Sequence, residues 1–203
     1  FILWRLGGVE PFKIQLINTG LAEQFLIHMK VALVAGLIVA SPYILYVLFA
    51  FVSPALYENE RRYSVRLTLS AYLMFLLGVV VNYFLVFPLT VRFLGTYQVN
   101  NSVANMLTIS SYVDTLLMLS LMMGIVFELP VLSWLLARFG LLRREWMENY
   151  RKHAFVGILI LAAVITPTSD VITLLIVSLP IWLLYELSIF VVGRVQTNNL
   201  MNS

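Results

Sequence analysis

Residues 115–137 read TLLMLSLMMGIVFELPVLSWLLA, and this stretch decides the fold. It is long enough to cross a bilayer as a helix, because about 20 apolar residues span the hydrocarbon core. Its single charged residue is Glu128, and a carboxylate at membrane depth is costly unless it faces protein or water. Pro130 follows two residues later and predicts a local break in the helical hydrogen bonding. The stretch therefore predicts a transmembrane helix with a polar site near its middle.

The composition of the whole chain agrees with a membrane protein. Of the 203 residues, 61% are hydrophobic and 11% are charged, and the mean hydropathy is +0.93. No polar stretch is long enough to form a separate soluble domain. The absence of cysteine excludes disulfides and thiolate metal sites. The chain has no Gly-rich phosphate loop, nucleophile elbow or zinc motif, so we expect no enzyme activity, no cofactor, no metal site and no nucleic-acid partner.

Five apolar runs predict five membrane spans, so the expected fold is an all-α, polytopic transmembrane helical protein. The run at 154–165 is short, and we expect thinning of the bilayer around it. The predicted order is an extracytoplasmic segment at 1–24, transmembrane helices at 25–52, 67–94, 113–137, 154–165 and 171–193, cytoplasmic loops at 53–66 and 138–153, an extracytoplasmic loop at 95–112, an extracytoplasmic turn at 166–170 and a cytoplasmic tail at 194–203.

The distribution of lysine and arginine predicts the orientation. Nine of the 13 lie in the loops at 53–66 and 138–153 and in the tail, and four lie on the other side. Basic residues are enriched in cytoplasmic loops. The side with nine is therefore predicted to be cytoplasmic, and the C-terminus to lie in the cytoplasm.

Several local features follow from the same reading. Residues 1–24 are expected to form an interfacial, partly helical segment. Ser110 and Ser111 supply hydroxyls that could cap the third span. Asp170 is placed to cap the last span, and Glu186 to snorkel or to pair with a basic residue. The polar residues 196–203 are expected to fray.

Two acidic sites have more than one interpretation. Glu128 could be a structural carboxylate, a proton relay or a docking point for another helix, since intramembrane acids serve all three roles. The loop that contains Glu58, Glu60, Arg61 and Arg62 could be an ordinary solvated loop. It could also bind a basic peptide, because a carboxylate accepts a bidentate hydrogen-bonded pair from arginine.

Four motifs, taken together, resemble one family. They are Ser-Pro-Tyr-Ile-Leu-Tyr at 41–46, Phe-Val-Ser-Pro-Ala-Leu-Tyr at 51–57 followed by Glu-Arg-Arg at 60–62, Phe-Glu-Leu-Pro-Val at 127–131, and Ile-Thr-Pro at 165–167 with Asp170. In this order and spacing, the chain resembles the TatC subunit of the twin-arginine protein translocase across residues 25–194.

The resemblance implies six helices with both termini in the cytoplasm. Five spans with residue 1 outside agree with this if a sixth, N-terminal helix precedes the chain. The resemblance also implies a core receptor that binds twin-arginine signal peptides of folded precursor proteins. The implied partners are TatA/TatB-type single-span proteins, export is driven by the protonmotive force, and the location is the inner membrane of a bacterial-type cell. Self-association stays open.

The resemblance assigns roles to individual residues. For signal-peptide binding it implies Glu60, Tyr57, Arg61 and Pro54. For an intramembrane site that receives partner helices it implies Glu128, Pro130, Thr166 and Asp170. The chain departs from the family at Leu174, where many members carry a glutamine.

The alternative function is a proton-coupled secondary transporter that uses Glu128 as its titrating acid. No internal repeat supports it, although many secondary transporters have one. An intramembrane enzyme ranks third, since no paired nucleophile and base are found within the spans.

Overall fold

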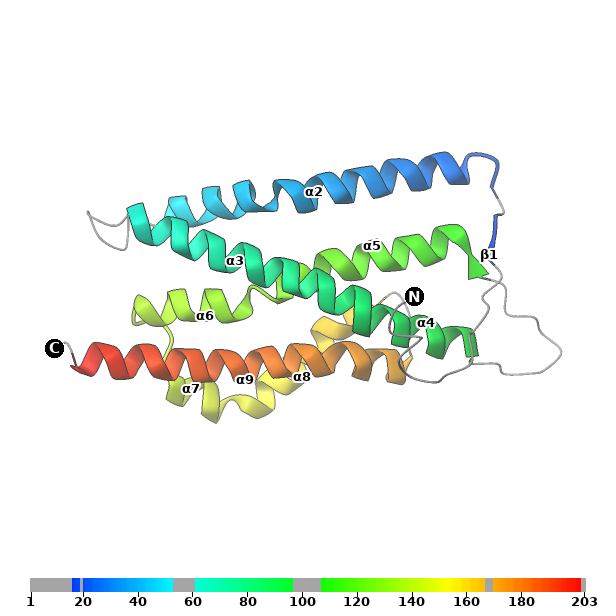
Figure 1. The fold of residues 1–203 in the computed structure, drawn as a ribbon. Coiled ribbons are helices and arrows are strands. Elements are labelled where there is room, and N and C mark those ends of the chain that lie inside the picture. The colour runs from blue at the N-terminus through cyan, green and yellow to red at the C-terminus, as the bar shows by residue number, and fades with distance from the viewer. Residues whose placement is uncertain (1–15, 19, 53–60, 97–106, 167–169, 202–203) are drawn as a thin grey trace.

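The computed structural model describes residues 16–18, 20–52, 61–96, 107–166 and 170–201 (Figure 1). Apart from two very short strands, every described element is helical, which confirms the all-α fold. In chain order the elements are β1 (Leu16–Ile17), α2 (Glu23–Val52), α3 (Arg61–Val81), a π-helical segment (Asn82–Val86), α4 (Phe87–Thr96), β2 (Leu107–Thr108), α5 (Ile109–Val126), α6 (Leu129–Arg138), α7 (Arg144–Asn149), α8 (Arg151–Ile165) and α9 (Val171–Met201).

Four helical stretches in the described part are long and apolar enough to cross a membrane. They are Glu23–Phe51, Val65–Leu94, Ile109–Arg138 and Val171–Thr197, and they correspond to four of the five predicted spans. The remaining predicted span lies in α8, which has 15 residues and a length of about 22 Å at 1.5 Å per residue. This is shorter than the hydrocarbon core of about 30 Å, so the count of five spans is approximate.

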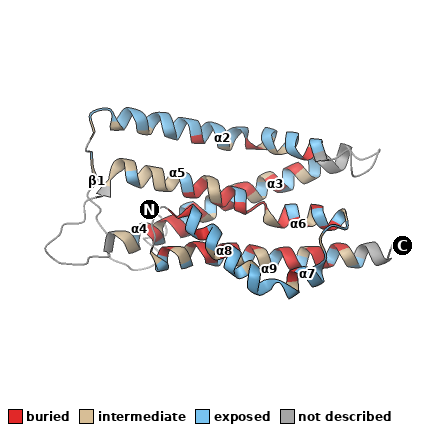
Figure 2. Cartoon of the chain, turned by 180° about the vertical axis from the view of Figure 1, so that it is seen from behind, coloured by how far each residue is buried: buried red, intermediate tan, exposed pale blue. Residues whose placement is uncertain are grey.

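The core lies where α4, α5, α8 and the first half of α9 meet (Figure 1). Along the other half of the bundle, α9 packs against α6, and α3 packs against α5 and α2. In the view of Figure 2, α2 is exposed along much of its length, and buried residues gather on the helices below it. The fully buried side chains of the main cluster include those of Val86, Leu119, Met123, Ala162, Val177 and Ile181.

Two glycines allow α3 and α5 to approach closely. A Cβ atom added at Gly78 would lie 2.6 Å from the backbone oxygen of Met123, and one added at Gly124 would lie 2.6 Å from the ring of Phe75. Small residues at helix crossings are common in membranes, because close backbone approach maximises van der Waals contact there. This crossing fixes the end of α5 against α3, and so positions the residues that follow it.

A π-helical segment, Asn82–Val86, joins α3 to α4 and ends two residues before Pro88. Here the N–H of Phe87 donates to the carbonyl of Asn82. A proline ring clashes with the carbonyl four residues earlier in a regular α-helix, and π segments are one way to relieve such a conflict. The segment also places Asn82 in the interior, where its amide nitrogen donates to Ser120 Oγ at 2.9 Å.

The expectation of a partly helical segment at 1–24 stays a prediction, because most of this segment lies outside the described residues. Leu16 and Ile17 are extended and pair in parallel with Leu107 and Thr108, and α2 begins at Glu23. Single-sequence periodicity could not detect this pairing, because it depends on a strand 91 residues away.

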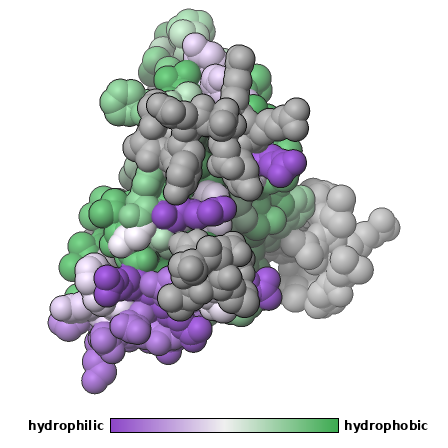
Figure 3. All heavy atoms as spheres, turned by 90° about the vertical axis from the view of Figure 1, so that its left-hand side faces the viewer, coloured by the Kyte–Doolittle hydropathy of each residue, from purple (hydrophilic) through white to green (hydrophobic). Residues whose placement is uncertain are grey.

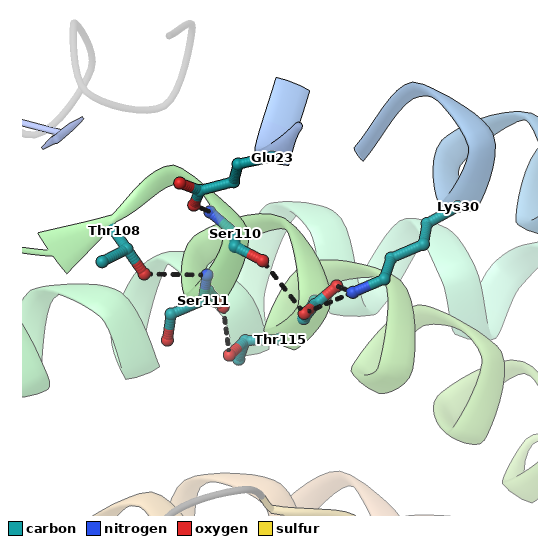
Figure 4. Close-up of polar contacts among 7 residues, drawn as sticks. Glu23, Lys30, Thr108, Ser110, Ser111 and Thr115 are labelled. Atoms are coloured by element: carbon teal, nitrogen blue, oxygen red, sulfur yellow. Dashed lines mark hydrogen bonds and ion pairs between the residues drawn. The ribbon is translucent and has the colours of Figure 1, made fainter. Parts of the chain in front are cut away.

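The predicted cap of the third span is also corrected. Thr108 is the N-cap of α5, and its hydroxyl accepts from the N–H of Ser111 at 3.2 Å. Ser110 and Ser111 lie inside the helix. The N–H of Ser110 donates to Glu23 Oε1 at 3.0 Å, so that Glu23 satisfies a second free donor of this helix end (Figure 4).

Residues 196–201 of the predicted frayed tail instead belong to α9, which continues to Met201, and the last two residues lie outside the described part of the chain. Contacts with the start of α7 accompany this extension. Val195 is buried, and Gln196 Oε1 accepts from the backbone N–H of Arg144 at 3.2 Å. These contacts are tertiary, and so the polar sequence alone did not predict them.

Candidate functional site

The proposed signal-peptide site falls mostly on residues outside those that the structure describes. Pro54, Tyr57 and Glu60 belong to the segment 53–60, which is not described, and Arg61 is the first residue of α3. The assignments of these four residues therefore stay predictions. What the structure does provide is their setting, between the end of α2 and the start of α3.

Glu128 lies in the break between α5 and α6, as its neighbour Pro130 predicts. The N–H of Glu128 donates to Ile125 O at 3.1 Å, a tighter turn than in an α-helix, and its carbonyl accepts from the N–H of Leu132 at 2.9 Å. Pro130 is at the start of α6 and has no N–H to offer to Val126. The regular α-helical hydrogen bonding is thus interrupted at Glu128 and resumes immediately after it.

The side chain of Glu128 faces the protein interior. Only 6% of the residue is exposed, and among the described residues neither carboxylate oxygen has a hydrogen-bond partner. Glu128 is ten residues from Arg138, the end of α6, or about 15 Å along a helix. A buried carboxylate without a partner is costly, and both oxygens are enclosed by the protein.

Thr166 and Asp170 flank the turn between α8 and α9. Thr166 is buried, and its hydroxyl donates to the carbonyl of Ala162 at 2.9 Å. Asp170 Oδ2 accepts from the N–H of Thr173 at 2.7 Å, and the Thr173 hydroxyl also donates to it. Asp170 therefore caps α9 as predicted. Neither residue hydrogen-bonds to the Glu128 carboxylate, so the structure does not join the proposed partner site into one polar cluster.

Leu174, where the resemblance leads one to expect a glutamine, packs against the main core cluster. Its backbone N–H donates to the carbonyl of Asp170 at 3.2 Å. The side chain at this position therefore serves packing and offers no polar group near the cap.

Glu186 forms an ion pair with Arg151, with Nη2 and Oε2 3.0 Å apart. This confirms the expected pairing with a basic residue. Nearby, the hydroxyl of Tyr185 donates to the carbonyl of Met147 at 2.8 Å. These contacts join α9 to α7 and α8, so Glu186 is a structural residue at this end of the bundle.

Sequence reasoning missed a second polar cluster, which lies at the end of the molecule where α2 and α5 begin (Figure 4). Lys30 Nζ lies 2.8 Å from both carboxylate oxygens of Asp114, and Ser110 Oγ lies 3.4 Å from Asp114 Oδ2. Together with the contact between Glu23 and Ser110, this pair fastens α2 to α5. In the sequence, the only sign of this pair is that Lys30 and Asp114 each directly precede an apolar run.

Fold and site together define a class: a polytopic helical membrane protein with a buried carboxylate at a helix break. Comparison with known proteins narrows the class. The model of the family described as Sec-independent protein translocase protein (TatC) matches residues 3–180. The chain therefore belongs to the TatC family, whose members are components of a protein translocase and not enzymes.

Individual relatives agree with the family match. A TatC protein of Koribacter versatilis is 40% identical over 87% of this chain and 65% of its own length. One of Carboxydothermus hydrogenoformans is 36% identical over 94% of this chain and 78% of its own length. The chain thus spans about two thirds to three quarters of these relatives.

The fold has a solved counterpart. A crystal structure of the twin-arginine translocase receptor TatC superposes with a TM-score of 0.79 at 35% identity, over 90% of this chain and 80% of that chain. A second crystal structure of the receptor, in the detergent DDM, gives a TM-score of 0.77. The similarity is high enough to confirm the resemblance and the multi-pass membrane fold.

Proposed function

We propose that this protein is the core receptor of a twin-arginine translocase in a bacterial-type inner membrane. It binds twin-arginine signal peptides of folded precursors and assembles with TatA/TatB-type single-span proteins for export driven by the protonmotive force. The observation that carries the proposal is the match to the TatC family over residues 3–180. The sequence between α2 and α3 adds Glu60, the acidic residue that recognition of arginine requires.

Glu60 is the proposed contact for a signal arginine. A guanidinium forms two parallel hydrogen bonds with a carboxylate, and charge-assisted bonds of this kind are about twice as strong as neutral ones. Tyr57, Arg61 and Pro54 are proposed to shape the same site. The loop is predicted to lie on the cytoplasmic side, where a precursor would present its signal peptide before transport.

Glu128 and Pro130 are proposed to receive a polar residue from the transmembrane helix of a partner. The carboxylate has no hydrogen-bond partner among the described residues, and a donor from a partner would remove the cost of its burial. Because both oxygens are enclosed by the protein, this role requires the side chain to turn toward the surface when a partner docks. Thr166 and Asp170 are proposed to form a second part of the partner site, at the turn between α8 and α9. Both side chains are held by hydrogen bonds to the adjoining helices, Thr166 to α8 and Asp170 to α9.

Binding of a twin-arginine peptide to the purified chain tests the function. Glu60→Ala should weaken binding by roughly ten- to a hundredfold, because hydrogen bonds to charged groups contribute about 1.5–3 kcal/mol. Glu60→Gln should weaken it nearly as much, and the matched control Glu58→Ala should matter less. If wild type and Glu60→Ala bind the peptide equally, Glu60 belongs to an ordinary solvated loop.

A further inference from the structure

An apolar cavity of about 390 Å³ opens between α3, α6 and α9. Its walls include Leu67 and Met74 from α3, Val131 and Trp134 from α6, and Leu187 from α9. Ligand pockets in proteins usually measure about 300–1,000 Å³, so a flexible chain of methylene groups fits this space. The walls offer such a chain apolar contact on several sides, which a flat lipid-facing helix surface does not.

Two arginines lie beside this cavity. Arg66 is one of its lining residues. Arg138 stacks on Trp134, with its guanidinium carbon 5.3 Å from the ring centroid, and Trp134 also lines the cavity. Arg66 is the second residue of one apolar span and Arg138 is the last residue of another. Both side chains are exposed, so they stand where the apolar part of the bundle meets the water.

Within the part of the chain that the structure describes, neither arginine has an acidic partner. Two described carboxylates on α9 and α7 pair with other arginines: Glu186 pairs with Arg151 and Glu148 with Arg144. As far as the described residues go, the charges of Arg66 and Arg138 are therefore available to an anion. Figure 3 shows the molecule from the end at which α3 begins and α6 ends. Hydrophilic residues gather on part of this end, and hydrophobic residues lie along its flanks.

We propose that the cavity binds one anionic phospholipid of the leaflet at this basic end. One acyl chain lies in the cavity and the phosphate lies at Arg66, with Arg138 adding a second positive charge. An arginine guanidinium matches the geometry of phosphate oxygens, and basic residues near the membrane surface attract anionic lipids. This inference goes beyond the proposed receptor function and does not depend on it.

Quenching of tryptophan fluorescence tests the proposal. The purified chain is placed in bilayers of phosphatidylcholine that contain a small fraction of phosphatidylglycerol, with bromine on the acyl chains of one lipid or the other. Brominated phosphatidylglycerol should quench more strongly than an equal fraction of brominated phosphatidylcholine. The difference should disappear in Trp134→Phe, because Trp134 is the tryptophan that lines the cavity.

Charge variants identify the headgroup contact. Arg66→Gln and Arg138→Gln should each lower the preference for the anionic lipid about fivefold, given a contribution of about 1 kcal/mol per basic residue at the surface. Arg143→Gln is a matched control, because Arg143 also stacks on a tryptophan, Trp146, at 5.8 Å, but neither of these two residues lines the cavity. It should leave the preference unchanged.

Three outcomes would overturn the proposal. Equal quenching by the two brominated lipids would show that the cavity does not select an anion. Loss of the difference on adding inorganic phosphate would place a soluble anion at the arginines. If Arg66→Gln and Arg138→Gln keep the lipid preference but weaken binding of a single-span peptide, the cavity receives a helix and not a lipid.

Discussion

Glu128 is the central residue of the proposed partner site, and its variants separate a docking role from a structural one. Glu128→Gln retains a donor and an acceptor, so it should keep much of the transport activity. Glu128→Ala should insert and fold, because it removes a buried carboxylate that has no partner among the described residues. It should lose crosslinks to single-span partners at this depth. The measurement is site-specific photocrosslinking together with export of a precursor.

The Glu128 prediction has a clear failure. If Glu128→Ala exports cargo at the wild-type rate and its crosslinks are unchanged, the residue does not hold a partner. A matched control is Ser133→Ala, since Ser133 is a buried polar residue of α6 with no assigned role. That variant should change neither crosslinks nor export.

At the scale of single residues, the sequence predicted the local roles of residues but not their long-range partners. The break at Glu128 follows from Pro130 alone, and the cap at Asp170 follows from its place before a helix. The partner of Lys30 could not be predicted, because Asp114 is 84 positions away. The same is true of Asn82, which looks like an isolated polar residue until α5 brings Ser120 against it.

At the scale of helices, the close crossing of α3 and α5 predicts that a larger side chain at Gly78 destabilises the fold. Gly78→Ala should lower the free energy of unfolding by about 1–3 kcal/mol, the usual cost of overpacking, because the new methyl group would meet the backbone oxygen of Met123. Thermal unfolding in detergent measures this effect.

The control for Gly78 lies on α2, where Gly36 has no neighbouring atom within 4 Å of an added Cβ. Gly36→Ala should be neutral or stabilising by up to about 1 kcal/mol, since alanine favours the helix. If Gly78→Ala is as stable as wild type, α3 and α5 do not cross as closely as the structure indicates.

Helix positions were predictable from hydropathy, but helix ends were not. The apolar runs located the four long spans, because burial in lipid requires continuous apolar sequence. The ends depend on tertiary contacts: Thr108 caps α5 next to the pairing with Leu16 and Ile17, and α9 continues past its apolar part beside the start of α7. The π-helical segment before Pro88 likewise relieves a clash between the proline ring and the preceding turn, which a hydropathy profile does not detect.

At the scale of the whole molecule, the structure groups the basic residues at one end. The starts of α3, α7 and α8, the end of α6 and the last turns of α9 lie together, away from β1 and the start of α5 (Figure 1). Nine of the lysines and arginines in the described residues belong to these elements or the α6–α7 connection, and Lys30 and Arg92 lie toward the opposite end. The charge asymmetry counted along the sequence is thus also an asymmetry in space.

This asymmetry predicts which end faces the cytoplasm, since basic residues stay on the cytoplasmic side. Cysteine labelling with an impermeant reagent added from outside should modify Asn101→Cys and spare Asn59→Cys. Among described positions, Ser111→Cys should be labelled and Leu141→Cys should not, because these exposed residues lie at opposite ends of the span formed by α5 and α6. After the membrane is made permeable, all four should react, which controls for access. The reverse pattern would invert the orientation, and it would place the Glu60 loop on the side from which a precursor could not reach it before transport.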